Sequence, residues 1–260
     1  MIADLRYELV RLRTLRSTYW LVGLGLVLNA ALAGIIAYAT RDLTEPGVVA
    51  AFMTSGSAFS PLPFLAVLVG LLGAFAFGHE YRHRTITATL TATPRRSLVV
   101  AAKVLVTVAL AVVVAIVGLV LNWAVSSIVS GRVVHALTPE LRPVMAGFVL
   151  YVVLWGVMGV ALGLLIRNLP VVVTFLFLIP LVIEPLLSAL GLLAIFDSVS
   201  GALRYLPFAA GARLMSFGDS GADGAGADDP LSRTAGGLTF AVWTAVVLAV
   251  GWYLFRRRDA

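Results

Sequence analysis

The sequence predicts an all-α integral membrane protein with about six transmembrane helices. Of its 260 residues, 60% are hydrophobic and only 12% are charged, whereas about 25% are charged in an ordinary soluble domain. The apolar residues form continuous runs close to the ~20 residues that a membrane-spanning helix needs. Strands of a membrane barrel would alternate in polarity, and these runs do not, so helices are expected.

Six apolar runs are the candidate spans of a single transmembrane domain covering residues 1–260. They lie at about 19–40, 59–78, 98–128, 144–166, 171–196 and 238–255. The third run is longer than a bilayer requires, so this helix should tilt or project beyond the membrane.

The residues before the first span, 1–18, should form a helix in the cytoplasmic membrane interface. The apolar residues Ile2, Leu5, Leu9 and Leu12 recur there at helical spacing. Arg6 and Arg13 lie on another face. The apolar run that follows is too long for the core of a cleavable signal peptide, so none is expected.

The charges predict the topology. If six spans alternate from an inside N-terminus, the inside holds 13 basic and four acidic residues, and the outside holds six basic and eight acidic ones. This bias predicts a multi-pass protein of the plasma membrane with both termini in the cytoplasm. It also explains the net charge of +6 without a nucleic-acid partner. The absence of cysteine excludes disulfides and cysteine-based metal sites.

An extracytoplasmic segment is expected over residues 197–237, before the last span. Its second part, 218–237, is rich in Gly, Asp and Ala, which is typical of a loop. Its first part, 199–217, is moderately apolar around Pro207 and suits a short helix that dips back into the outer leaflet.

The cytoplasmic segment 79–97, between the second and third spans, is too polar to cross a membrane. Ile86 and Leu90 are four residues apart, so a helix there would present a small apolar face among charges and threonines. Pro94 should end this helix. A short helix of this kind suits docking into a groove on a partner protein.

The same segment resembles the region between the second and third helices of ABC-2 type transporter permeases. The resemblance rests on Glu80, Thr85-Ile86, Leu90, Pro94-Arg95-Arg96 and Lys103. The six spans, the N-terminal interfacial helix, the outer dip and the basic C-terminus extend it over the whole chain. Arg84 departs from the pattern, because that family usually has glycine before the threonine.

The resemblance implies a permease subunit of an ATP-driven exporter, with this segment as its coupling helix. Two permeases, identical or paralogous, would join two separate ATPase chains that bind ATP and Mg. The chain agrees in having no G-x-x-x-x-G-K-[ST] phosphate loop, so no cofactor and no enzymatic activity of its own are expected. An importer or an ion-driven carrier is the alternative within transport, although carriers usually show two related halves.

The residues expected to couple ATP hydrolysis to transport are Glu80, Arg82, Arg84, Thr85, Ile86, Leu90 and Arg95. The alternative for the arginines is that they anchor helix ends to anionic headgroups, which contributes about 1 kcal/mol each. Anionic headgroups do not attract the carboxylate of Glu80, so anchoring to lipid does not explain this residue as well as it explains the arginines.

A different class of function is suggested by His79-Glu80-Tyr81-Arg82-His83, which is a literal H-E-x-x-H sequence. On a helix it would place two histidines for zinc and a glutamate as general base, as in a membrane-embedded metalloprotease. A catalytic zinc needs a third protein ligand, and the only other histidine, His135, is predicted on the opposite side of the membrane. We therefore expect no metal.

Polar residues inside the spans are candidates for a substrate pathway. Glu184 lies between Pro180 and Pro185, which should bend the helix. An acid in a span is either functional or paired with a polar group of another helix. Asn29 and Asn122 are further pathway candidates, although such residues more often link helices.

A small-residue face on the fourth span consists of Gly156, Gly159 and Gly163. It predicts close helix packing within the subunit rather than at a dimer contact.

Overall fold

Six helices are long and apolar enough to cross a membrane, which confirms the all-α class and the predicted number of spans within the described residues. They are α2 (Arg16–Ala39), α4 (Phe64–Arg82), α6 (Arg96–Ser130), α7 (Arg142–Ile166), the rod Leu169–Leu190 and α12 (Arg233–Arg257). The structure is a computed structural model that describes residues 2–55, 64–82, 85–87, 91, 95–191, 201–218 and 231–257.

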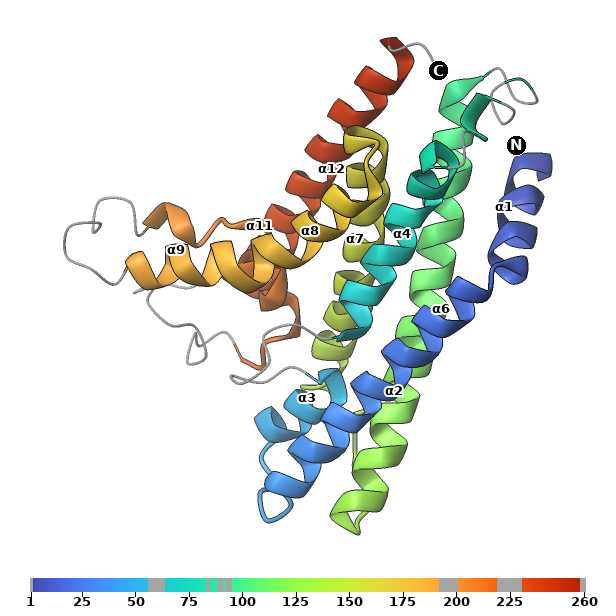
Figure 1. Ribbon diagram of the computed structural model, residues 1–260. Helices are drawn as coiled ribbons and strands as arrows, with labels where there is room; N and C mark the ends of the chain where they lie inside the picture. Colours follow the sequence, from blue (N-terminus) through green and yellow to red (C-terminus); the bar gives the residue numbers. More distant parts are fainter. Residues whose placement is uncertain are drawn as a thin grey trace.

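The centre of the bundle is the pair α4 and α7 (Figure 1). In their apolar stretches 72% and 67% of the residues are buried, whereas the other spans reach at most 33%. Glycines permit the close approach: a Cβ on Gly159 would overlap the carbonyl of Gly70, and one on Gly73 would overlap the carbonyl of Gly156. The predicted role of the glycines of α7 in packing within the subunit is thus confirmed.

The rod Leu169–Leu190 is bent, as its prolines predict. It consists of α8 (Leu169–Leu178), a π-helical turn η1 (Ile179–Ile183) and α9 (Glu184–Leu190). Pro180 lies in this turn and has no N–H to donate to the preceding helical turn. The wider turn accommodates the missing hydrogen bond. In Figure 1 the rod leans away from α7 and α12.

The third predicted span is one continuous helix, α6, of 35 residues. At 1.5 Å per residue it is about 52 Å long, against about 30 Å for the hydrocarbon core of a bilayer. The prediction that it exceeds the bilayer is consistent with this length.

Short helices occupy both ends of the bundle. The N-terminal helix α1 (Ile2–Thr14) is separated from α2 by Leu15, whose backbone is extended with ψ of 112°. The predicted short helix before the last span is α11 (Pro207–Ala212), followed by the 3-10 turn η3 (Arg213–Met215). The sequence did not predict α3 (Pro46–Thr54), which buries Phe52 and Met53.

One end of the bundle gathers α1, the end of α4, the start of α6 and the end of α12 (Figure 1). We call it the loop end, because the segment 83–95 connects α4 and α6 there. The connection between α2 and α3 and the end of α6 lie at the opposite end.

The N-terminal helix turns its apolar residues outward. Tyr7, Leu9 and Val10 are each at least half exposed, whereas Glu8 is buried. A helix with its polar face on the protein and apolar residues outside suits a membrane interface. That location stays a prediction.

Candidate functional site

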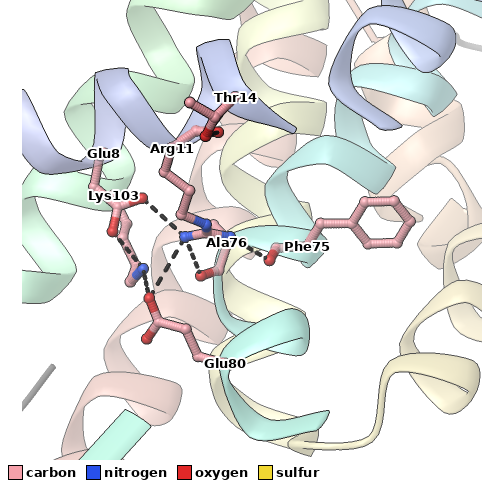
Figure 2. Close-up of polar contacts among 7 residues, drawn as sticks. All are labelled: Glu8, Arg11, Thr14, Phe75, Ala76, Glu80 and Lys103. Carbon is pink, nitrogen blue, oxygen red and sulfur yellow. Dashed lines mark hydrogen bonds and ion pairs between the residues drawn. The ribbon is translucent and has the colours of Figure 1, made fainter. Parts of the chain in front are cut away.

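A buried cluster of four charged side chains joins three helices at the loop end (Figure 2). Glu8 and Arg11 come from α1, Glu80 from the last turn of α4, and Lys103 from the second turn of α6. Residues three apart on a helix lie on one face, so Glu8 and Arg11 point together toward α4 and α6. We call this set the ion cluster.

Lys103 is the centre of the ion cluster. Its Nζ lies 2.5 Å from Glu8 Oε1 and 2.5 Å from Glu80 Oε1, and its side chain is 0% exposed. The ammonium also lies 5.1 Å from the centroid of the Phe77 ring, within the range of a cation–π contact. One lysine therefore links a carboxylate of α1 to a carboxylate of α4.

Arg11 completes the ion cluster and fixes α1 to the backbone of α4. Its guanidinium donates to Glu8 at 2.9 Å and approaches Glu80 at 3.5 Å. It also donates to the carbonyls of Phe75 at 2.7 Å and Ala76 at 3.0 Å. Two cations thus face two carboxylates, so the buried charges neutralise one another. Buried ions are tolerated when they are paired and hydrogen-bonded in this way.

The ion cluster brackets the segment 83–95. Glu80 precedes the segment and Lys103 follows it, and the backbone N–H of Thr85 donates to the carbonyl of Glu80 at 3.0 Å. Ile86 is 6% exposed and packs in a second small core with Phe77 and Phe255. Both flanks of the segment are therefore attached to the bundle by buried side chains.

The seven residues predicted to couple the chain to an ATPase separate into three groups. Glu80 and Ile86 are buried inside the chain, contrary to the expectation that Ile86 would belong to an exposed docking face. The physical reason is that an apolar side chain beside Phe77 and Phe255 gains more by joining the chain's own core. Arg82, Thr85 and Arg95 are exposed, so they remain candidates for contact with a partner.

Arg84 and Leu90, the other two, lie outside the described residues.

The geometry gives no support to the zinc alternative. Glu80 is committed to Lys103 and Arg11, so it is not free to act as a general base. His79 stacks on Phe75 with ring centroids 4.6 Å apart, and His83 lies outside the described residues. Within the described ranges, no three His, Cys, Asp or Glu side chains are placed to hold a metal.

Glu184 caps a short helix of another part of the chain. Its carboxylate accepts the backbone N–H groups of Phe208 at 2.9 Å and Ala209 at 2.6 Å, at the start of α11. A carboxylate at a helix N-terminus satisfies unpaired N–H groups and complements the helix dipole. Glu184 is 3% exposed, so this contact accounts for its burial in an apolar span.

Asn29 and Asn122 form a buried polar link. Asn29 donates to Asn122 Oδ1 at 2.9 Å, and Asn122 donates to the carbonyl of Met53 at 2.7 Å and to Ser55 Oγ at 2.9 Å. Ser55 in turn donates to the carbonyl of Asn29 at 2.8 Å. The link joins α2 and α6 to the end of α3.

Sequence reasoning missed the roles of Glu8, Arg11 and Lys103. A usable signal was present, because Lys103 lies inside a long apolar run and the acidic Glu8 lies between Arg6 and Arg11 in the N-terminal helix. Such residues require partners, but the sequence does not say which.

No protein-family model and no curated protein matches this chain.

Proposed function

We propose that this chain is the permease subunit of an ABC-2 type ATP-driven exporter, acting with a second permease copy and a separate nucleotide-binding ATPase. The proposal is supported by six apolar helices and by the sequence pattern from Glu80 to Lys103. In this proposal the loop end faces the cytoplasm of the cell, and ATP and Mg bind to the partner.

The attachment of the segment 83–95 is the observation that favours this proposal most. A simple connecting loop needs no buried contacts at its flanks, whereas a segment on which a partner acts must be linked to the helices that it moves. Here Glu80 and Lys103 meet across the two flanks, and Ile86 is anchored in the chain's core. A displacement of the segment would therefore act on α1, α4 and α6 together.

The contact with the ATPase is proposed to involve Arg82, Thr85 and Arg95, which are exposed around this segment. Glu80 then acts by holding the segment to the bundle. ATP binding would favour the conformation that the partner binds more tightly, which is how a ligand shifts a two-state equilibrium.

The three pathway candidates contribute differently to the proposal. The hydrogen bonds of Asn29 and Asn122 favour a role in holding helices together. The hydrogen bonds that Glu184 accepts from the start of α11 favour a role in holding this short helix in place. A substrate path would then follow the outer surfaces of the spans at the contact with the second permease copy.

The test is site-directed crosslinking, which the absence of native cysteine makes specific. Thr85→Cys should crosslink to a copurifying ATPase in membranes. Arg82→Glu together with Arg95→Glu should abolish copurification of the ATPase, because the reversed charges turn attraction to the ATPase into repulsion. Arg41→Glu is the matched control, since Arg41 is exposed in the connection between α2 and α3, at the opposite end of the bundle.

Two results would contradict the proposal. One is the absence of a copurifying ATPase whose hydrolysis depends on this chain. The other is labelling of Thr85→Cys by an impermeant maleimide from outside intact cells, which would put the loop end on the wrong side of the membrane.

A further inference from the structure

The last helix, α12, contacts the segment 83–95 at one end and the short helix α11 at the other. Arg96, the first residue of α6, donates to the carbonyl of Phe255 at 2.8 Å and to that of Arg256 at 3.4 Å. Its guanidinium also lies 5.8 Å from the centroid of the Phe255 ring. These carbonyls are in the last turn of α12, where a cation satisfies unpaired acceptors and complements the helix dipole.

Apolar contacts strengthen this attachment. Phe255 is 2% exposed and packs edge-on against Phe77 of α4, with ring centroids 5.7 Å apart. Ile86, inside the loop segment, belongs to the same small core. The end of α12 is therefore held by residues on both flanks of the segment 83–95 and by one within it.

At its other end α12 packs so closely against α11 and η3 that two of its contact positions leave no room for a side chain. A Cβ on Gly236 would lie 2.5 Å from the carbonyl oxygen of Ala210, and one on Gly237 would lie 2.5 Å from Leu214 Cδ2. The ring of Phe240 lies tilted against that of Phe208, with centroids 5.5 Å apart. Close-packed surfaces of this kind transmit displacement instead of absorbing it.

The short helix α11 is in turn bound to the bent rod by Glu184. The two hydrogen bonds from Phe208 N and Ala209 N to this carboxylate link α11 to α9. A continuous series of contacts thus runs from the segment 83–95 through α12 and α11 to the rod. The helix α12 has 25 residues and is about 37 Å long.

We propose that Arg96 is a positioning residue that couples the loop segment to α12, and that α12 carries the displacement of this segment to α11 and Glu184 at the far end. The inference rests on the proposed function, because an ATPase supplies the displacement. It assigns to α12 a role that contact with the ATPase alone does not require.

The experiment measures one distance at the far end by electron spin resonance. Spin labels are attached at Val242→Cys on α12 and Ile35→Cys on α2, both well exposed at 60% and 64%. The chain is reconstituted in nanodiscs with its copurifying ATPase, with and without a non-hydrolysable ATP analogue and Mg. We expect nucleotide to change the distance by about 1–2 Å, the size of typical helix shifts.

Arg96→Ala should abolish this change while the ATPase still copurifies. Arg96→Lys should restore part of it, because a lysine retains a cation near the helix end. Arg257→Ala is the matched control and should leave the change intact: it also removes an arginine from the last turn of α12, but that side chain lies over Tyr253 of its own helix.

The outcomes separate the two proposals. If no ATPase copurifies, the proposed function fails and the inference fails with it. If the ATPase binds but Arg96→Ala leaves the nucleotide-dependent distance change intact, or if no change occurs in the unmodified background, only the role of Arg96 and α12 is overturned.

Discussion

Replacing Lys103 by methionine tests the ion cluster most directly. Methionine has a similar length but no charge, so among the described residues the variant leaves Arg11 as the one cation in contact with the buried carboxylates of Glu8 and Glu80. Removing one partner of a buried ion pair costs about 3–5 kcal/mol. Arg11 remains 2.9 Å from Glu8 and 3.5 Å from Glu80, so we expect the lower end, about 3 kcal/mol.

The assay is reversible unfolding in mixed micelles with increasing SDS, followed by tryptophan fluorescence. Glu80→Gln in the Lys103→Met background should recover part of the loss, since it removes the carboxylate that has lost its nearest cation. With the Glu80→Gln single variant measured as well, the four unfolding free energies give the coupling between the two residues, expected at about 0.5–3 kcal/mol for groups in contact. Arg41→Met is the control, because its side chain is 56% exposed and lies 3.9 Å from an almost fully exposed Asp42; it should change the free energy by less than about 1 kcal/mol.

The reasoning is refuted if Lys103→Met unfolds at the same free energy as the unmodified chain. That result would mean that the four charges are solvated separately and that α1 is not bound through them.

Three further substitutions test other contacts by the same unfolding assay. Glu184→Gln should lower the free energy of unfolding by about 1–3 kcal/mol, because an amide can accept only one of the two N–H groups and turns a donor toward the other; unchanged stability would mean that α11 is not capped. Gly159→Ala should prevent normal packing of α4 on α7, because its Cβ would overlap the carbonyl of Gly70, whereas Gly23→Ala, with nothing within 4 Å of its Cβ, should stabilise α2 by about 0.5–1 kcal/mol; equal effects of the two would contradict the helix contact. Asn122→Ala should cost about 1 kcal/mol, typical of a polar link between membrane helices, and a larger effect on transport than on unfolding would restore its candidacy for the substrate pathway.

The sequence predicted the spans well because span length and apolarity depend on the bilayer and not on tertiary contacts. The bend at Pro180 and the packing of α7 through its glycines also follow from local chemistry. The helix α3 escaped prediction because its nine residues are too short for a span, and its burial depends on α6 and α7.

The candidate site was less predictable for the same reason. Glu8 and Lys103 are 95 residues apart, and charge counting assigned both simply to the cytoplasmic side. Ile86 matched the pattern of an exposed helix face, yet the aromatic side chains that cover it come from α4 and α12. Pairings between distant segments require the folded bundle.

The single extended residue between α1 and α2 has a consequence for the architecture. Leu15 alone sets the angle between the two helices, since the residues on both sides of it are helical. If the ψ of Leu15 became helical, α1 and α2 would form one continuous helix. Glu8 and Arg11 would then move away from Lys103. The orientation of the N-terminal helix therefore depends on one backbone torsion, which the ion pairs of Glu8 and Arg11 help to hold.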